Sequence, residues 1–358
     1  FDGTEINLKL LKIINENLYK RGPDSGGIYN NKSIGLGNRR LKIIDFLGGE
    51  QPFESEDKNI ILVFNGEIYN YIELREDLIK EGYKFKTESD TEVVLKSYQA
   101  YGKKMLDKLN GMFSFSIWDR NKKKLFIARD RLGVKPLYFY YDKKNFIFSS
   151  TLNSIVKNTD IKKIIDSESL IYYSFLGYIP SPKTIWKNFH KLEPGSYIEI
   201  ENNKFSITKY WELKININEK INEKNVQTHT DELENIILNS NEIQSRSDAN
   251  IGVFLSGGLD SSFIAKILTL NYKKTFNTYT VDFEGKKIKE IENVKNFSKN
   301  LNTRINYEII NFEDNKKIFY EVIKSLDEPN SDSASIPSYL LAKNSKKNND
   351  KVILNGCG

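Results

Sequence analysis

The hydrophobic pattern of the first 210 residues predicts short strands and amphipathic helices in mixed order. Short apolar runs lie at 34–36, 41–44 and 60–64, and strands are predicted at 113–118, 125–128, 137–141 and 146–148. Apolar residues at helical spacing predict helices over 5–19, 71–81 and about 90–102. The last four strands are separated by short polar turns, which is typical of an antiparallel meander. An α+β domain rich in antiparallel sheet is therefore expected here.

From about residue 230 the pattern changes to regular alternation of helix and strand. The strands are predicted at 251–255, 278–283, 305–310 and 351–354. The helices are predicted at 231–244, after residue 262, and at 288–300, 314–325 and 335–347. This alternation is typical of a parallel sheet with helices on both faces, in which ligands bind at the carboxyl ends of the strands. Residues 212–228 show no clear period and are interpreted as a linker.

A glycine-rich loop joins the first strand of this second part to the helix after it. The loop reads Ser256-Gly257-Gly258-Leu259-Asp260-Ser261. Glycines let the backbone approach a phosphate chain closely, and free N–H groups at a helix start favour an anion. Asp260 is placed to hold Mg²⁺ that bridges phosphates. No Gly-Lys-Ser/Thr follows, so this is not a Walker loop. A tight strand–helix turn without a ligand is the alternative, and the whole string favours the nucleotide.

Composition and charge exclude several classes of protein. The chain has 358 residues, a net charge of +6 and 39% hydrophobic residues, which fits a soluble globular protein. Its lysines are scattered among Asn and Glu, which indicates a solvated surface and not a nucleic-acid site. No apolar run approaches the roughly 20 residues of a membrane helix. The single cysteine, Cys357, excludes an internal disulfide and fits a reducing, cytoplasmic compartment. Two isolated histidines, His190 and His229, argue against a histidine-rich metal site or a Ser-His-Asp triad.

Several strings resemble one known family, in the order in which that family carries them. The strings of the first part are Arg21–Asp24, Arg40–Asp45, Asn65–Asn70, Ser89–Glu92, Gly111–Phe115 and Ala128–Tyr138. They resemble the class II glutamine amidotransferase domain. The glycine loop resembles the pyrophosphate loop of ATP pyrophosphatases. With 327–329 and 334–340 added, nearly the whole chain resembles glutamine-hydrolysing asparagine synthetase.

The resemblance implies the fold and the domain boundaries. Residues 1–211 are expected to form an N-terminal-nucleophile hydrolase sandwich, with antiparallel sheets between helices and the N-terminal cysteine segment missing. Residues 212–228 are the linker. Residues 229–358 are expected to form a parallel-sheet ATP-pyrophosphatase domain that is truncated at its C-terminal side.

The resemblance also implies a glutaminase site in the first part. In the family, an N-terminal cysteine thiol attacks the glutamine amide carbon, and its own α-amino group is the base. The positions carried over are Asn65 and Gly66 for the oxyanion hole, Arg40 for the α-carboxylate, Glu67 and Asp90 for the α-ammonium, and Leu41 and Ile43 for the pocket wall, with Asn65 also touching glutamine. Taken singly, Asn65-Gly66 is a turn, Asp90 a helix cap and Arg40 a surface ion pair. The Arg21–Asp24 string is expected to be structural.

For the second part, the resemblance implies adenylation of the aspartate side chain with ATP and Mg²⁺, followed by attack of ammonia. The expected ATP-binding residues are Leu255, Ser256, Gly257, Gly258, Asp260, Ser261, Val281, Asn355 and Gly356, with Asp260 as the metal ligand. Plain strand packing is the alternative for Leu255 and Val281. The expected partners are glutamine, aspartate and ATP, without nucleic acid or membrane, and a homodimer is compatible with the resemblance.

Two departures from the family pattern bear on activity. The family begins Met-Cys-Gly-Ile, whereas this chain begins at Phe1, beyond that string. The family carries an acidic residue where this chain has Cys357. The chain as given is therefore expected to be inactive. Two alternatives stay open: a paralogue that amidates another carboxylate, on an envelope sugar or a secondary metabolite, and a non-catalytic relative that binds glutamine or ATP.

Overall fold

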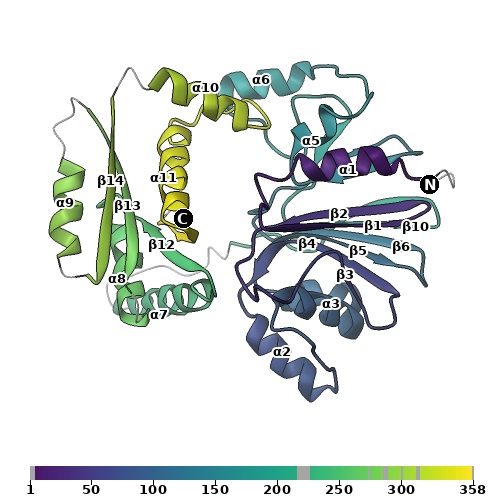
Figure 1. The fold of residues 1–358 in the computed structure, drawn as a ribbon, viewed down its shortest axis with the longest axis horizontal. Helices are drawn as coiled ribbons and strands as arrows, with labels where there is room; N and C mark the ends of the chain where they lie inside the picture. The colour runs from purple at the N-terminus through teal and green to yellow at the C-terminus, as the bar shows by residue number, and fades with distance from the viewer. Residues whose placement is uncertain are drawn as a thin grey trace. The chain divides into compact units, whose positions relative to one another are not determined.

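The chain forms two compact units, which Figure 1 draws as a ribbon. The computed structural model describes residues 5–215, 226–272, 275–284, 289–299, 301–311 and 315–356. Unit 1 consists of Phe1–Lys214 together with Asp327–Ser331, and unit 2 consists of Ile215–Leu326 together with Asp332–Gly358. Most of the predicted linker, residues 216–225, lies outside the described residues.

Unit 1 combines antiparallel strands with short helices. Its helices are α1 (Leu8–Glu16), α2 (Tyr71–Lys80), α3 (Asp90–Tyr101), the 3-10 turn η1 (Gly102–Lys104), α4 (Met105–Lys108), α5 (Leu152–Val156) and α6 (Ser167–Leu176). Its strands are β1 (Ser25–Asn31), β2 (Ile34–Arg40), β3 (Phe53–Glu54), β4 (Ile60–Ile68), β5 (Gly111–Asp119), β6 (Lys124–Arg129), β7 (Tyr138–Tyr141), β8 (Phe146–Ser149), β9 (Phe189–Lys191), β10 (Ser196–Glu201) and β11 (Lys204–Lys209).

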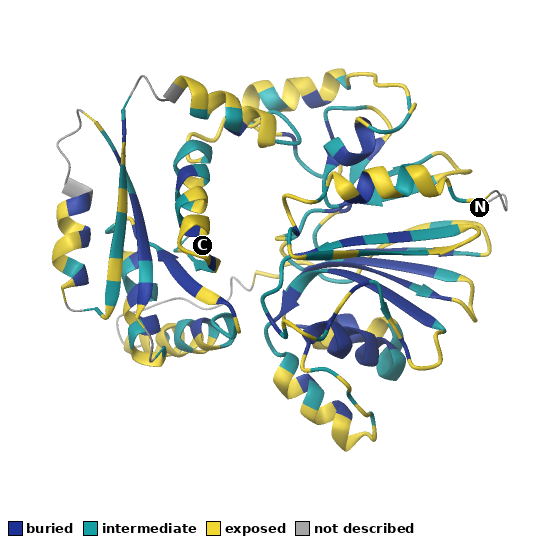
Figure 2. Cartoon of the chain, in the orientation of Figure 1, coloured by how far each residue is buried: buried dark blue, intermediate teal, exposed yellow. Residues whose placement is uncertain are grey.

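The centre of unit 1 is a six-stranded sheet of order β11-β10-β6-β5-β4-β3, with antiparallel pairing between its strands. Strand β4 is apolar on both faces because both are covered. Ile60, Leu62 and Phe64 enter the core beneath α2, α3 and α4, while Ile61 and Val63 enter a second core. Figure 2 shows α3 and the central strands as the most buried part of this unit.

The second core joins the six-stranded sheet to a further layer of strands. That layer contains the β1–β2 pair and a three-stranded sheet of order β8-β7-β9. Leu36 from β2 and Phe139 from β7 share this core with Ile127 of β6. Helix α5 packs on the other face of the three-stranded sheet, where Leu152 and Ile155 meet Phe189. Helices therefore lie outside two antiparallel layers, and the predicted sandwich is confirmed.

One strand prediction in unit 1 is corrected. The predicted meander is not one sheet: β5 and β6 belong to the six-stranded sheet, whereas β7 and β8 belong to the three-stranded sheet. The chain changes sheet between Arg129 and Tyr138, and a polar connection alone does not tell whether the next strand joins the same sheet. The apolar run at 41–44 is a loop, because the guanidinium of Arg40 binds the carbonyl oxygens of Ile44, Asp45 and Gly48.

Unit 2 is a parallel α/β unit. Its elements are α7 (Val226–Gln244), β12 (Asn250–Phe254), α8 (Leu259–Asn271), β13 (Phe276–Phe283), α9 (Lys289–Ser298), β14 (Thr303–Ile310), α10 (Asn315–Ser325), α11 (Ser335–Lys347) and β15 (Asp350–Leu354). The strand order is β14-β13-β12-β15, and all pairs are parallel. Figure 1 shows α9 and α11 on opposite sides of the sheet. The predicted parallel sheet with helices on both faces is confirmed.

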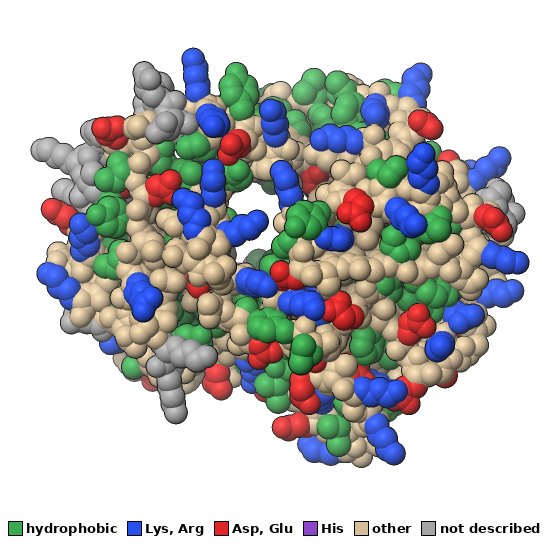
Figure 3. Space-filling view, viewed as in Figure 1, with side chains coloured by type: hydrophobic (Ala, Val, Ile, Leu, Met, Phe, Trp, Pro, Cys, Tyr) green, Lys and Arg blue, Asp and Glu red, His purple; other side chains and the backbone are tan. Residues whose placement is uncertain are grey.

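The surface and the helices of the described residues add two observations. On the face shown in Figure 3, acidic side chains lie between the basic ones over both units. Among the described residues, no helix has the combination of length and apolar composition that crossing a bilayer requires.

Candidate functional site

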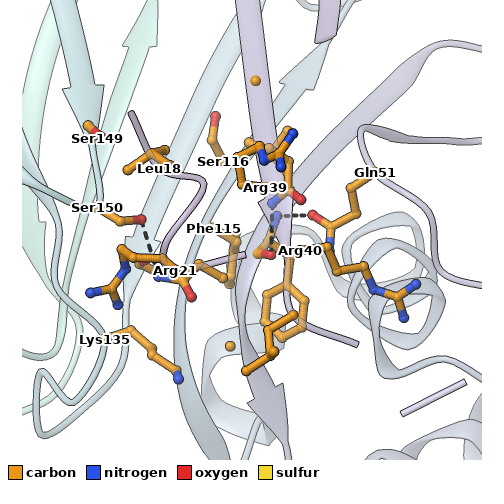
Figure 4. A pocket seen from close by; sticks show the side chains of 18 of the residues that line it. Leu18, Arg21, Arg39, Arg40, Gln51, Phe115, Ser116, Lys135, Ser149 and Ser150 are labelled. Carbon is orange, nitrogen blue, oxygen red and sulfur yellow. Dashed lines mark hydrogen bonds between the residues drawn. The ribbon is translucent and has the colours of Figure 1, made fainter. Parts of the chain in front are cut away.

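Unit 1 contains a cavity of about 470 Å³. Its wall draws on β2, β4 and β5, on the loop after β2, and on the turn between β8 and α5. In Figure 4, Arg21, Lys135 and Ser150 lie on one side of the cavity, and Arg40 and Gln51 lie on the other. All seven residues predicted for glutamine line it: Arg40, Leu41, Ile43, Asn65, Gly66, Glu67 and Asp90.

Strand β4 places two of these residues side by side. Asn65 and Glu67 are two residues apart, so their side chains leave the strand on the same face. Gly66 lies between them against the backbone of β5. A Cβ atom at Gly66 would be 2.4 Å from the carbonyl oxygen of Met112, so only glycine fits without moving the strands. The Asn-Gly dipeptide, a turn signal in isolation, is here part of a paired strand.

The side chain of Asn65 is held by the turn that precedes α5. Its Nδ2 donates a hydrogen bond to Ser150 Oγ at 3.2 Å. Ser149 and Ser150 both line the cavity. An amide nitrogen that is already oriented by one bond presents its second N–H in a fixed direction, which suits it to an oxygen atom of a ligand.

Glu67 and Asp90 form a buried acidic pair. Both side chains are 5% exposed. Asp90 is the first residue of α3, and its Oδ2 accepts the backbone N–H of Ile68 at 3.1 Å. Burial raises the pKa of Glu67 to about 8, with the charge of Asp90 adding to the shift and Lys135 opposing it. Burial also raises the pKa of Asp90, to about 6. Such a pair favours a cationic ligand, which would stabilise the ionised forms.

Arg40 contributes positive charge to the same cavity, and this charge opposes the rise in the pKa of Asp90. Its guanidinium donates to the carbonyl oxygens of Gly48 at 2.7 Å, Ile44 at 2.9 Å and Asp45 at 3.0 Å. Three of its five N–H groups are thereby used to shape the 41–51 loop, and its Nη1 also lies 3.8 Å from the carboxylate of Glu50. The same guanidinium thus shapes the loop and lines the cavity in which a ligand is predicted to bind.

Two further cations of the cavity wall were not predicted from the sequence. Arg21 was expected to be structural, and Lys135 received no role, yet both line the cavity. Burial and the charge of Arg21 lower the pKa of Lys135. The loop that carries Lys135 is shaped by Asp130, which accepts the N–H groups of Val134 at 2.9 Å and Lys135 at 3.0 Å. The sequence offered one signal, because both residues lie within the strings that carry the resemblance.

In unit 2, a hydrogen bond between two serine hydroxyl groups joins the two ends of the predicted phosphate loop. Ser256 Oγ and Ser261 Oγ are 3.0 Å apart, and the N–H of Gly258 donates to Ser256 Oγ at 3.3 Å. Gly257 has φ +78°, a conformation that favours glycine. Gly258 is the N-cap of α8 and has no side chain to cap the helix, so no N-cap side chain occupies the first N–H groups, which an anion could bind.

A second glycine segment meets this loop. Strand β15 runs parallel to β12, so the carboxyl ends of the two strands are adjacent. A Cβ at Gly356 would be 2.6 Å from the backbone nitrogen of Ser261, so the Asn355-Gly356 segment lies directly against the start of α8. The strand order reverses at β12, which is where an open parallel sheet binds its ligands.

Two further predicted residues of unit 2 lie on the strands. Leu255, directly before the loop, is 1% exposed and belongs to the core, with its backbone N–H bonded to Tyr279 O at 2.9 Å. Val281 is half-buried near the carboxyl end of β13. Cys357 lies outside the described residues.

The described residues test whether a metal ion fits this loop. They contain no group of three or more His, Cys, Asp or Glu side chains that is arranged to hold a metal. Asp260 lies in the first turn of α8, beside the loop. Since Mg²⁺ is commonly held by one or two carboxylates together with phosphate oxygens, a single carboxylate fits an ion that arrives with a nucleotide.

Comparison with known proteins matches each part of the chain to a family. Residues 2–211 match the glutamine amidotransferase domain family, and residues 232–358 match the asparagine synthase family. Asparagine synthetase [glutamine-hydrolyzing] 1 of Bacillus subtilis is 38% identical over 95% of this chain and 53% of its own length. Putative asparagine synthetase [glutamine-hydrolyzing] 2 of Methanocaldococcus jannaschii is 35% identical over 99% of this chain and 72% of its own length.

A third relative and one solved structure complete the comparison. A putative asparagine synthetase of Mycobacterium tuberculosis is 32% identical over 94% of this chain and 54% of its own length. The chain thus spans about half the length of two of these three curated relatives. The solved glutamine phosphoribosylpyrophosphate amidotransferase from B. subtilis aligns with 86% of this chain and 64% of its own, at 16% identity and a TM-score of 0.43. By the two family matches and these relatives, the chain belongs to the glutamine-hydrolysing asparagine synthetase family.

Proposed function

We propose that the complete enzyme converts aspartate to asparagine, using ATP and ammonia taken from glutamine. The observation that carries the proposal is the charge pattern of the unit 1 cavity in a chain that also contains the asparagine synthase domain. An acidic pair, Glu67 and Asp90, lies in the same cavity as the cation Arg40. An amino-acid zwitterion needs both charges, and glutamine fits a cavity of this size.

The proposed glutaminase step uses the cavity as follows. Arg40 holds the α-carboxylate, and Glu67 with Asp90 holds the α-ammonium. The thiol of an N-terminal cysteine attacks the amide carbon, and negative charge develops on the amide oxygen. Asn65 Nδ2 and the Gly66 N–H stabilise that oxygen. Ammonia leaves, and water then releases glutamate.

The proposed synthetase step uses the loop of unit 2. The phosphates of ATP lie against the Ser256–Ser261 loop and the N–H groups at the start of α8, with Asn355 and Gly356 beside them. Asp260 would hold Mg²⁺, which supplies charge neutralisation for the phosphates. The aspartate β-carboxylate attacks the α-phosphorus, pyrophosphate leaves, and ammonia displaces AMP from the β-aspartyl adenylate. We also propose that Leu255 and Val281 contact the adenine.

Amino-acid analysis tests the proposal in the complete protein. Aspartate, ATP and glutamine together should give asparagine, glutamate, AMP and pyrophosphate in equal amounts. Ammonium chloride should replace glutamine for asparagine formation. Pyrophosphate release that requires a carboxylate other than aspartate would show a paralogue with another acceptor. Binding of glutamine or ATP without turnover would overturn the enzymatic proposal.

A further inference from the structure

A five-residue segment far along the sequence belongs to the glutaminase unit. Asp327–Ser331 is part of unit 1, although the residues on both sides of it in the sequence belong to unit 2. The N–H of Ser331 donates to the carbonyl of Gly177 at 2.8 Å. Glu328 forms a 2.6 Å ion pair with Lys191 and accepts the N–H of Ile185 at 2.9 Å. The segment is therefore anchored at both of its ends.

Asp327 contacts a different part of unit 1 from its neighbour Glu328. Its Oδ1 accepts the backbone N–H of Asn153 at 2.9 Å, across 174 positions of sequence. Asn153 is the second residue of α5, whose own N-cap residue, Thr151, makes no side-chain cap bond. Asp327 is distant in sequence from α5. Its carboxylate nevertheless accepts an N–H group in the first turn of this helix, as the side chain of an N-cap residue does in many helices.

The start of α5 connects directly to the cavity wall. Ser149 and Ser150, which line the cavity, come immediately before Thr151. Within this turn, the N–H of Thr151 donates to Ser149 Oγ at 3.3 Å, and Ser154 Oγ donates to Ser149 Oγ at 2.7 Å. Ser150 Oγ in turn accepts the side-chain amide of Asn65 at 3.2 Å. A continuous series of hydrogen bonds and covalent links joins Asp327 to Asn65.

Charge links Asp327 to the same cavity. Burial lowers the pKa of Arg21, a cation of the cavity wall, and the negative charge of Asp327 opposes that shift. Glu328, by contrast, pairs with Lys191, and neither Lys191 nor Ile185 lines the cavity. The two adjacent carboxylates therefore have separable roles, one toward the cavity and one toward the anchoring of the segment.

We propose that Asp327 is a positioning residue for glutamine hydrolysis: by holding the start of α5 it fixes Ser150, and through Ser150 it aims the amide of Asn65 at the reacting amide oxygen. This inference rests on the proposed glutaminase function of the cavity. A donor that is misplaced by about 1 Å costs up to about 100-fold in rate, whereas substrate binding by Arg40, Glu67 and Asp90 is independent of this turn.

The experiment compares three variants of the complete enzyme in glutamine hydrolysis. Asp327→Ala removes the acceptor, Asp327→Asn keeps a carbonyl oxygen that can accept the Asn153 N–H, and Glu328→Ala is the matched control for anchoring. We expect Asp327→Ala to lower kcat about tenfold or more with KM within twofold. Asp327→Asn should restore most of kcat, and Glu328→Ala should keep kcat within twofold. Thermal unfolding checks that all variants are folded.

A second variant keeps the inference testable if Asp327→Ala does not fold. Ser150→Ala removes only the acceptor for Asn65 and should lower kcat in the same way, while the Asp327→Asn/Ser150→Ala double variant should be no slower than Ser150→Ala. A wild-type kcat in Asp327→Ala or Ser150→Ala would overturn the inference, as would an equal loss in Glu328→Ala. Absence of glutamine hydrolysis by the unmodified enzyme would instead overturn the proposed function on which the inference rests.

Discussion

At the scale of single residues, the unit 1 cavity keeps two acids away from water. Glu67 and Asp90 are buried next to each other, and the pKa of each is raised by burial. Because a folded-state pKa near 8 lies above neutral pH, Glu67 holds a proton at neutral pH while no ammonium group is bound beside it. An amino-acid ammonium favours the ionised carboxylate and displaces that proton.

Glutamine binding should therefore release a proton and depend on pH. As the pH falls below about 8, the ionised fraction of Glu67 falls, and the affinity for glutamine should decrease by up to about tenfold per pH unit. Below about 6, protonation of Asp90 should steepen the loss. Calorimetry in two buffers of different ionisation enthalpy measures the released proton. Glu67→Gln should abolish the release near pH 7, and unchanged release in that variant would assign the proton to another group.

Asp260 is the carboxylate proposed to hold Mg²⁺ in unit 2. It lies in the first turn of α8, beside the Ser256–Ser261 loop. If it holds Mg²⁺ with the phosphates, Asp260→Asn should lower aspartate-dependent ATP–pyrophosphate exchange about 100-fold or more, since an amide is a weak ligand for Mg²⁺. Glutamine hydrolysis should stay unchanged.

The matched control for Asp260 is Asp248→Asn. Asp248 is an exposed carboxylate just before β12, at the amino end of the strand and not at the loop. The Asp248→Asn variant should catalyse ATP–pyrophosphate exchange at the wild-type rate. Exchange near the wild-type rate in Asp260→Asn as well would remove the assigned metal role.

At the scale of elements, unit 2 places two strand ends against each other. The carboxyl ends of β12 and β15 are adjacent because the strands pair in parallel, and Gly356 leaves no room for a Cβ beside Ser261. The distance between the two loops is therefore set by the absence of a side chain at one position.

Gly356→Ala should separate these loops and weaken nucleotide binding. The added methyl group would lie 2.6 Å from Ser261 N and 2.9 Å from Asp260 C, so the backbone must shift. We expect about a tenfold or greater loss of ATP affinity by fluorescence or calorimetry, as the phosphate cradle opens. Glutamine binding to unit 1 serves as the internal control. Wild-type ATP affinity would show that the two loops do not bind one ligand together.

The elements also show which structure is accessible to sequence reasoning. In unit 2 the alternation of helix and strand located β12 to β15 closely, since each strand is a local apolar segment. In unit 1 the same reasoning found an apolar run at 41–44 but gave it no structure, because the carbonyl contacts of Arg40 that make it a loop leave no sequence pattern. It also merged β5 to β8 into one sheet, because the choice of partner strand depends on residues distant in sequence.

The residues in and around the cavity also differ in whether the sequence predicts them. Asn65, Glu67 and Asp90 were predicted because each lies in a short string that carries the resemblance. The contact of Asp327 with unit 1 was not predicted, because its partner Asn153 is 174 positions away and no local pattern records that contact.

At the scale of the whole molecule, unit 1 is not one continuous stretch of sequence. A fragment that ends at Lys214 lacks the acceptors for two backbone N–H groups, those of Asn153 and Ile185, and the partner of Lys191. We expect these two amides to exchange with solvent at least about tenfold faster in the fragment than in the complete chain, by hydrogen exchange.

The amides of the six-stranded sheet are the control for that experiment. Those in β4 and β5 pair within residues 60–119 and should keep their protection in the fragment. Equal protection at Asn153 and Ile185 in both proteins would mean that Asp327–Ser331 contributes little to this turn in solution.

The interrupted unit also has a consequence for chimaeras of this chain. A hybrid joined in the region 212–228 would combine the first 211 residues of this chain with the later residues of a relative. Its α5 and Lys191 would then face a segment at 327–331 that comes from the other parent. We expect such a hybrid to lose these contacts unless the five residues of this chain are restored with residues 1–211.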